Sequence, residues 1–471
     1  MDIAAPAARA DQVLVALRDR LGATAVLTGD EVPARNCNDW SASLPQTPLA
    51  VIRPADAQGV ADAIAVCRQA RLPFVPQGGL TGLCRGASPE AGWVAISLER
   101  MTGIEEIDPA SATMTVKAGT PLETIQKAAD EAGFFFPLDL GSRGSCAIGG
   151  NLSTNAGGNR VIRYGMTRDL VLGLEAVLAD GTILKGVRKY VKNNTGVDLK
   201  QLFVGTEGTL GVVTRAALRI FPAPVEQQVA LCALESFDSV RAFLALARSR
   251  LAGDLTAFEV MWNEYYRLTT ELVQGVAAPL ATKHPFYVLL ESSGADADRI
   301  RNDLEEMLET ALEDDLITDA TIASSGAAAA AIWKIRDSSV ELGRAIGPNG
   351  VGFDISLAID SMEAFANRIK EDVKKIDSRA YAIVFGHAGD GNLHVNVKYP
   401  PGTDRNDEIT KLVYGITGDF AGSISAEHGI GILKRPYLKL SRTEEEIETM
   451  RTLKRALDPH HILNPGRIFT I

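Results

Sequence analysis

Three glycine-rich stretches in the first half of the chain limit its possible folds more than any other feature. They span residues 73–86, 141–159 and 205–214, and the first directly follows an apolar strand. Glycine leaves the backbone bare, so consecutive N–H groups can converge on a phosphate. One such stretch alone is more often a turn-rich surface loop. Three of them favour a domain that wraps an extended phosphate-bearing ligand such as FAD.

The two common nucleotide fingerprints are absent from the sequence. No GxGxxG opens a helix after a strand, and no GxxxxGK[ST] occurs. Their absence argues against a dinucleotide-binding NAD enzyme and against an ATPase.

The composition is that of a folded protein with more than one domain. The chain has 471 residues, of which 46% are hydrophobic and 23% charged, and a chain of this length normally divides into domains. Its formal charge of −11 repels nucleic acid and anionic lipid. We therefore expect no nucleic-acid partner, and an anionic substrate would need a local cationic group.

Cysteine usage and hydropathy favour a cytoplasmic location. The five cysteines are odd in number, scattered and without a CxxC pair. The N-terminus has no basic segment before an apolar stretch, and no window approaches the ~18 apolar residues of a membrane helix. We expect a reducing compartment and no transmembrane segment.

The pattern of apolar runs predicts where the domains divide. Residues 48–221 alternate short apolar runs with glycine-rich breaks and contain helices at 57–70 and 122–132. The FPAP sequence at 221–224 marks a boundary because two nearby prolines interrupt regular structure. We expect domains over residues 1–223 and 224–420, and a C-terminal segment, 421–471, that packs back on the first domain.

The later part of the chain has a different pattern of strand-like and helical runs. Strand-like runs alternate with helices near residues 240–250 and 298–313, which predicts a sheet with helices on one face. An alanine run at 327–331 is most simply helical. An amphipathic helix at 443–457 precedes an Asn-Pro-Gly turn.

A hairpin at residues 381–399 gathers polar side chains at one end. The AGDG turn separates two strands, so His387 ends one strand and His394 begins the next. Asn396 shares a face with His394 because strand side chains alternate. Glu427 and His428 follow in SAEHG. Two imidazoles and a carboxylate suit a catalytic zinc-type site, but these residues alone leave ordinary hydrogen-bonded histidines equally open.

Several long motifs resemble a known family. PQGGLTG, PLDLGSRGSCAIGGN, STNAGGNRVIRYGMTRD, GLEAVLADGTIL and FVGTEGTLGVVT are similar to the FAD-binding half of the vanillyl-alcohol oxidase superfamily, and most similar within it to D-lactate and D-2-hydroxyglutarate dehydrogenases. The similarity runs from about Pro48 to the C-terminal NPGR. It implies an α+β fold: a two-lobed FAD-binding domain of the vanillyl-alcohol oxidase type with an antiparallel-sheet cap domain.

The resemblance also implies roles for individual residues. The implied metal ligands, to zinc or alternatively manganese, are His387, His394 and Glu427, with His428 as the active-site base. Arg336 matches a substrate-binding arginine, and a guanidinium suits a carboxylate; without the family, a surface salt bridge is the simpler interpretation. Asn396 would help to fix the substrate. The residues implied to bind FAD are Pro76, Gln77, Gly78, Gly79, Leu80, Thr81, Gly82, Leu140, Gly141, Ser142, Gly149, Gly150, Asn151, Thr154, Asn155, Gly157, Gly158, Gly208, Gly211, Val212, Val213 and Asn464.

FAD is expected to bind without a covalent bond. Some relatives attach it through a histidine near the first glycine loop, but the first histidine of this chain is His284. Cys146 is the one remaining attachment point, and a free cysteine more often packs as an inert apolar side chain.

The implied activity is oxidation of a small anionic D-2-hydroxy acid to its 2-oxo acid, with metal assistance and hydride transfer to FAD. The alternatives are an accessory FAD-binding electron-transfer subunit of a glycolate oxidase-like complex, which would have lost the histidines and glutamate, and a non-enzymatic nucleotide-binding scaffold. No signature identifies the electron acceptor, so an electron-transfer flavoprotein and the quinone pool both stay open. A homodimer is one candidate assembly.

Two positions depart from the hydroxyglutarate enzymes. Those relatives place a threonine four residues after the arginine and a lysine before the aspartate of a KYD-like strand, where this chain has Val340 and Gly352. Each lost contact is worth roughly 1–3 kcal/mol when desolvated. We therefore expect D-2-hydroxyglutarate, D-lactate and D-malate to be oxidised comparably, unless another cationic group compensates.

Overall fold

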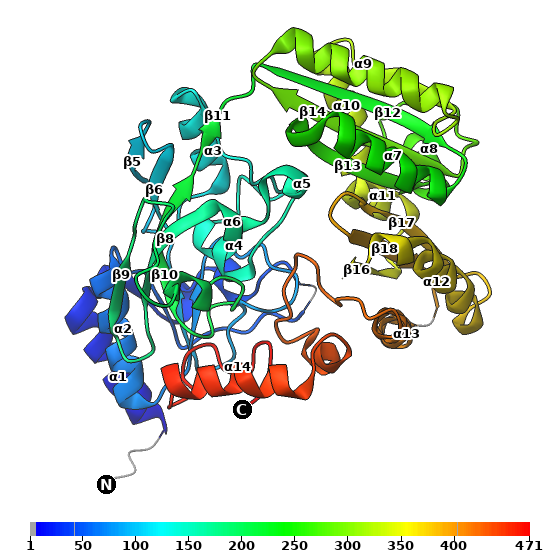
Figure 1. The fold of residues 1–471 in the computed structure, drawn as a ribbon. Helices are drawn as coiled ribbons and strands as arrows, with labels where there is room; N and C mark the ends of the chain where they lie inside the picture. The colour runs from blue at the N-terminus through cyan, green and yellow to red at the C-terminus, as the bar shows by residue number, and fades with distance from the viewer. Residues whose placement is uncertain (1–5, 42, 403) are drawn as a thin grey trace. The chain divides into compact units, whose positions relative to one another are not determined.

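The computed structural model describes residues 6–41, 43–402 and 404–471 (Figure 1). The chain forms two compact units. The first contains the chain up to Gly158, Gly165–Pro222 and Glu427–Ile471, and the second contains Asn159–Tyr164 and Ala223–Ala426.

The first unit holds two separate α+β lobes. One has a four-stranded sheet in the order β1-β2-β4-β3, in which β2, β4 and β3 are parallel. The other has a five-stranded antiparallel sheet in the order β5-β6-β10-β8-β9. The bounds are β1 (Val26–Leu27), β2 (Ala50–Ile52), β3 (Phe74–Gln77), β4 (Val94–Ser97), β5 (Ile104–Asp108), β6 (Thr113–Lys117), β8 (Val171–Val177), β9 (Ile183–Gly186) and β10 (Val212–Arg219).

Local signals in the sequence set the helix limits in this unit. Helix α2 covers Ala57–Ala70 as predicted, because the Asp56 side chain accepts a hydrogen bond from the Gly59 N–H (2.8 Å) at its start. Helix α14 (Glu444–Leu457) begins with a reciprocal capping box between Thr443 and Glu446. The remaining helices are α1 (Pro6–Leu21), α3 (Leu122–Glu131), α4 (Ile148–Thr154) and α6 (Thr167–Leu170).

The second unit is built on one seven-stranded antiparallel sheet in the order β15-β12-β14-β13-β17-β18-β16. This confirms the predicted antiparallel cap. The strands are β12 (Glu226–Leu234), β13 (Leu255–Trp262), β14 (Phe286–Gly294), β15 (Asp319–Ile322), β16 (Gly350–Ser356), β17 (Tyr381–His387) and β18 (Asn392–Lys398). The helices are α5 (Val161–Tyr164), α7 (Phe237–Arg250), α8 (Asn263–Leu272), α9 (Ala297–Glu313), α10 (Gly326–Asp337), α11 (Ser339–Ile346), α12 (Met362–Ile376) and α13 (Asn406–Asp419).

The prediction of helices on one face of this sheet is wrong, because helices lie on both. On one face, Phe243 of α7 packs against Phe258 of β13 with ring centroids 5.6 Å apart. On the other, Tyr265 of α8 stacks on Phe385 of β17 with centroids 4.1 Å apart. Every residue of β14 is buried. A strand buried on both sides reads as a continuous apolar run rather than an alternating one, and FYVLLES has that pattern.

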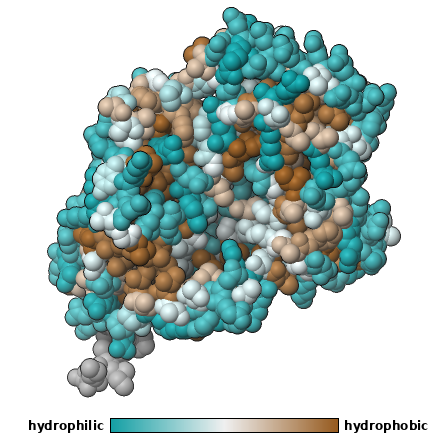
Figure 2. Space-filling view, viewed as in Figure 1, coloured by the Kyte–Doolittle hydropathy of each residue, from teal (hydrophilic) through white to brown (hydrophobic). Residues whose placement is uncertain are grey.

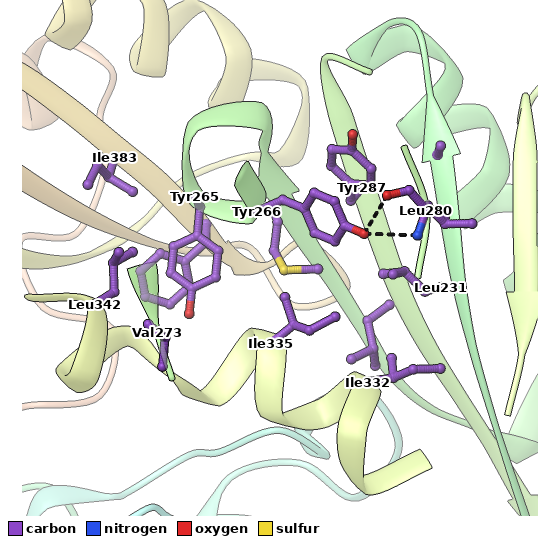
Figure 3. Packing of buried hydrophobic residues seen from close by; sticks show 14 of the residues in the cluster. Leu231, Tyr265, Tyr266, Val273, Leu280, Tyr287, Ile332, Ile335, Leu342 and Ile383 are labelled. Atoms are coloured by element: carbon purple, nitrogen blue, oxygen red, sulfur yellow. Dashed lines mark hydrogen bonds between the residues drawn. The ribbon is translucent and has the colours of Figure 1, made fainter. Parts of the chain in front are cut away.

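The core on the α8 side fixes helix α10 against the sheet (Figure 3). Ile332 and Ile335 of α10 pack into it. The Tyr265 hydroxyl donates to the backbone oxygen of Arg336 (2.5 Å), and that hydroxyl is fully buried with its ring. This hydrogen bond fixes the last turn of α10 relative to α8. Because α8 begins directly after β13 ends, the last turn of α10 is also fixed relative to that strand.

The visible surface is mostly polar, with hydrophobic residues in separate areas (Figure 2). Within the described ranges, no helix is both long and apolar enough to cross a membrane. All five cysteines are buried and carry free thiols.

Candidate active site

The first and second glycine-rich stretches pack directly against each other in the first unit. A Cβ at Gly79 would lie 2.2 Å from the Ser145 carbonyl oxygen, which no side chain could tolerate. A Cβ at Gly78 would lie 3.4 Å from the Gly150 nitrogen. Glycine at these positions therefore lets the two backbones come together.

The third stretch joins the same cluster of backbone. The Gly205 N–H donates to the Leu152 oxygen (3.0 Å), and the Glu207 N–H donates to the Ser153 oxygen (2.7 Å). Gly208 has φ +68°, and a Cβ there would lie 2.6 Å from Pro76 Cγ. The three stretches that the sequence singled out thus converge at one place.

Asn464 links the C-terminal segment to this cluster. Its side-chain amide donates to the Gly86 oxygen (3.0 Å) and to the Glu207 oxygen (2.8 Å), and the residue is 1% exposed. The side-chain oxygens of Asn464 and Asn151 are buried and have no hydrogen-bond partner in the part of the chain that the structure describes. Buried polar groups are normally satisfied, so these two atoms suit a bound ligand with hydrogen-bond donors.

A cavity of about 590 Å³ opens beside the first two stretches. Pocket volumes of this order accommodate large organic ligands. Its lining residues are Ala34, Arg35, Asn38, Asp39, Trp40, Gly78, Gly79, Leu80, Glu99, Thr102, Gly119, Pro121, Gly144, Ser145 and Ala147. The sequence reasoning missed residues 34–40, which carry no glycine pattern and reach the cavity only through the tertiary fold.

Other residues implied to bind FAD have structural roles within the loops. A Cβ at Gly158 would lie 2.1 Å from the Asp139 oxygen, and one at Gly211 would lie 2.6 Å from the Phe203 ring. The Thr154 hydroxyl donates to the Gly150 oxygen one turn earlier (3.1 Å). These positions shape the loops.

Cys146 lies inside the second stretch and is 4% exposed. Burial raises the pKa of its thiol, although the Asn151 amide, 3.6 Å from Sγ, acts in the opposite direction. A thiol kept protonated is a poor nucleophile, and this environment disfavours covalent attachment.

The hairpin of the second unit brings the two histidines together. Strands β17 and β18 pair so that His387 is opposite Asn392 and Phe385 is opposite His394. Both histidines therefore lie on one face of the sheet, and their Nε2 atoms are 3.4 Å apart. Asn396 is on the same face, opposite Ile383 and Gly352.

Glu427 directly follows Ala426, whose N–H donates to the Asp354 oxygen (3.4 Å) in strand β16. One ligand atom from each of His387, His394 and Glu427 lies within 4.8 Å of the other two. No other group of His, Cys, Asp or Glu side chains meets this criterion in residues 6–41, 43–402 and 404–471. Two imidazoles and a carboxylate are a donor set that fits zinc or manganese and leaves positions for substrate.

His387 forms a buried ring of hydrogen-bonded groups with Glu259 and Arg336. Glu259 of β13 lies 2.7 Å from His387 Nδ1 through Oε1 and accepts from Arg336 Nε through Oε2, also at 2.7 Å. The Nη2 of Arg336 donates to His387 Nε2 (2.8 Å). Glu259 is 1% exposed and Arg336 is 9% exposed. The arginine is thus a buried site residue, although its Nη1 also lies 3.6 Å from Asp337 Oδ1, an ion pair of the kind that the sequence left open.

Glu259 and Arg336 remain charged in this setting. Burial raises the pKa of Glu259, but its electrostatic interactions and hydrogen bonds with His387 and Arg336 outweigh burial and lower it. Burial likewise lowers the pKa of Arg336, and the charge of Glu259 outweighs that effect and raises it. The guanidinium is therefore a permanent positive charge beside the two histidines.

Asp354 provides a second buried carboxylate, next to His394. Its Oδ1 lies 4.0 Å from His394 Nδ1 and accepts a hydrogen bond from the Asn392 side chain (2.9 Å). The sequence reasoning missed both Glu259 and Asp354. A single acidic residue inside an apolar strand, as in LTAFEVMW and GFDIS, is the signal that could have found them, because such a residue is rarely buried unless paired.

His428 follows Glu427 in the first unit and is half-buried. It lies in a segment without helix or strand, before the 3₁₀ helix Arg435–Leu440. Its assignment as the base is what the family resemblance implies.

Comparison with known protein families matches both halves of the chain. Residues 48–186 match the family described as "FAD binding domain", and residues 223–468 match "FAD linked oxidases, C-terminal domain". A D-2-hydroxyglutarate dehydrogenase of Xanthomonas citri pv. viticola is 39% identical over 92% of this chain and 91% of its own length. The mitochondrial D-2-hydroxyglutarate dehydrogenase of Bos taurus is 37% identical over 91% of this chain and 78% of its own length.

Solved structures support the fold at low sequence identity. A p-cresol methylhydroxylase superposes with a TM-score of 0.77 at 16% identity, over 98% of this chain and 97% of that one. A 4-ethylphenol oxidase from Gulosibacter chungangensis superposes with a TM-score of 0.76 at 18% identity, over 100% of this chain and 99% of that one.

Proposed function

The chain belongs to the FAD-linked oxidase family, and we propose that it is an FAD-dependent dehydrogenase that oxidises D-2-hydroxy acids to 2-oxo acids with the help of a divalent metal. The observation that carries the metal-assisted step is the group formed by His387, His394 and Glu427 beside the buried Arg336. An accessory electron-transfer subunit would have no use for this set.

FAD would be held by the converging glycine-rich stretches and Asn464, and it supplies the acceptor for the hydride that leaves the substrate α-carbon. The fit rests on the backbone packing at Gly79, the buried oxygens of Asn151 and Asn464, and the adjoining cavity. We propose that the other residues assigned to FAD from the sequence also contact it.

His387, His394 and Glu427 would hold a zinc or manganese ion, whose positive charge would stabilise the alkoxide that develops on the substrate. Arg336 binds the substrate carboxylate and Asn396 helps to orient it, so that the α-hydrogen can point at the flavin. His428 takes the hydroxyl proton on an imidazole nitrogen. With the proton on His428, the C–O single bond would become a carbonyl as the α-hydrogen leaves as hydride, and bound FAD would be the two-electron acceptor.

The proposed substrates are D-2-hydroxyglutarate, D-lactate and D-malate. Val340, 58% exposed on α11, is apolar, and Gly352, exposed on β16, has no side chain. Neither therefore offers a charge or a hydroxyl to a second carboxylate. Lys398 is the cation that could compensate. It lies on the same face of β18 as His394 and Asn396 because side chains alternate along a strand.

The surroundings of Lys398 suit the binding of an anion. Its ammonium donates to the backbone oxygens of Gly347 (2.9 Å) and Gly343 (3.3 Å), and no described carboxylate lies within ion-pair distance. Burial disfavours the charged form of the ammonium and lowers its pKa, an effect that a substrate carboxylate close to the ammonium would oppose. A Cβ at Gly350, the residue opposite it, would lie 2.7 Å from Lys398 Cδ, so this glycine makes room for the lysine stem.

The test of the proposed function is anaerobic reduction of the flavin by a panel of D- and L-2-hydroxy acids. We expect bleaching by D-2-hydroxyglutarate, D-lactate and D-malate and none by their L-enantiomers. This measurement needs no knowledge of whether an electron-transfer flavoprotein or a quinone reoxidises the enzyme. A colourless preparation, or a yellow one that no D-2-hydroxy acid bleaches, would contradict the proposal.

Flavin should be released completely when the protein is precipitated with acid. The physical reason is that residues 1–283 contain no histidine and Cys146 is a buried, protonated thiol. The measurement is flavin absorbance in the supernatant and in the washed pellet. Colour in the pellet would point to Cys146, and the Cys146→Ser variant would then have to release it.

Replacing Lys398 should weaken oxidation of dicarboxylates selectively. In Lys398→Met, kcat/KM for D-2-hydroxyglutarate should fall by roughly 10- to 100-fold, because a charge-assisted contact is lost. The value for D-lactate, which has no second carboxylate, should stay within about twofold. Lys411→Met, on helix α13, is the control. An equal fall for both substrates would mean that Lys398 only caps α11.

A further inference from the structure

Glu259 uses both of its carboxylate oxygens at the proposed site and has almost no exposure to solvent. One oxygen lies 2.7 Å from His387 Nδ1 and the other accepts from Arg336 Nε at the same distance. The carboxylate therefore contacts one proposed metal ligand and the proposed substrate-binding arginine at once, from the neighbouring strand β13.

The chemistry of these contacts fixes the form of the histidine. An ionised carboxylate can only accept hydrogen bonds, so Nδ1 of a neutral His387 must carry the hydrogen. The guanidinium can only donate, and it points Nη2 at Nε2 of the same ring (2.8 Å), so Nε2 must hold the lone pair. Nε2 is also the atom that faces Nε2 of His394. Nε2 therefore carries the lone pair that a metal would need, and a metal bound there would replace the hydrogen bond from Arg336 Nη2.

We propose that Glu259 is a positioning residue that acts on both functions of the site. It holds His387 in the tautomer that presents the Nε2 lone pair, and it orients Arg336 for a substrate carboxylate. A metal-bound histidine commonly donates its other N–H to a carboxylate, which raises the basicity of the ligand. This inference rests on the proposed metal site but makes predictions about the protein in the absence of substrate.

Another glutamate in the same sheet separates this role from simple burial of a charge. Glu291 of β14 is also 1% exposed and lies on the same face of the sheet, opposite Ala257. It binds Arg160 (3.2 Å), Thr256 (2.8 Å) and the Trp333 indole (3.0 Å). None of these partners is a proposed ligand of metal or substrate. Removing a buried charge can by itself change the stability of the protein. Comparing substitutions at the two glutamates separates this general effect from a specific effect on the metal site.

The variant Glu259→Gln should bind metal more weakly without losing flavin. We expect the zinc affinity of the FAD-loaded, metal-stripped protein, measured by competition with a chromogenic chelator, to fall about 10- to 100-fold. Glu259→Asp should retain more of the affinity, because it keeps the charge. In Glu259→Gln, KM for D-lactate should also rise, because the amide has one acceptor oxygen and cannot accept from both His387 Nδ1–H and Arg336 Nε–H with its two side-chain atoms.

The matched variant Glu291→Gln should keep the zinc affinity of the parent within about twofold. A zinc affinity for Glu259→Gln as high as that of the parent, or an equal loss in Glu291→Gln, would overturn the proposal. A loss of zinc binding in the parent itself would instead contradict the metal site, which keeps the two failures apart.

A measurement on the parent protein does not depend on any variant folding correctly. With ¹⁵N-labelled histidine and no metal, the His387 resonances, assigned by their absence in His387→Gln, should show a protonated Nδ1 and an unprotonated Nε2. The opposite tautomer would overturn the proposal.

Discussion

Removing divalent metal from the purified protein is expected to slow flavin reduction by D-lactate by about a thousandfold or more, because stabilisation of a developing alkoxide by a metal ion is worth several kcal/mol and each 1.36 kcal/mol is a factor of ten in rate. The metal would be held by His387, His394 and Glu427, whose ligand atoms lie within 4.8 Å of one another. Stopped-flow bleaching of the metal-stripped, FAD-loaded protein measures this effect. Zinc or manganese should restore the rate.

Two controls make this expectation specific. Flavin content should stay constant on stripping, since the glycine-rich stretches are in the first unit and do not depend on the histidines. Magnesium should restore the rate poorly, because it prefers oxygen ligands to imidazole. A metal-free preparation with the full rate would contradict the metal half of the proposed function.

The sequence was most informative where backbone geometry restricts the residue type. Gly79 and Gly208 could be singled out because only glycine allows the backbone to approach as closely as it does there. The helix starting after Asp56 could be placed because capping is a local interaction. In the same way, the register of the hairpin follows from its short turn, which placed His387 and His394 together.

Contacts between distant segments could not be read in this way. Glu259 is 128 residues from its partner His387, and nothing local in the strand LTAFEVMW shows what the carboxylate meets. Helices on both faces of the sheet were missed for a related reason: the run FYVLLES shows that the strand is buried, but not which helices cover it. The role of Lys398 likewise depends on Gly350, which lies opposite it only once β16 and β18 pair.

Replacing His428 by alanine is expected to lower the rate of flavin reduction by roughly 10²- to 10⁴-fold, the usual contribution of a positioned general base. In the proposed mechanism three other side chains hold the metal, and His428 accepts the hydroxyl proton. The variant should therefore keep its zinc content and its flavin while it loses rate, as measured by elemental analysis and stopped-flow bleaching of the same sample.

The exposed His460 offers a matched substitution, and His460→Ala should keep the full rate. Added imidazole should recover part of the rate of His428→Ala, because a small base could enter the space left by the side chain, and it should do nothing for a variant that has lost its metal. If zinc is lost from His428→Ala in proportion to activity, His428 is a ligand and the proton must go to another group. If zinc stays and the rate falls, His428 acts on the proton and not as a metal ligand, because the rate is then lost with the metal still bound.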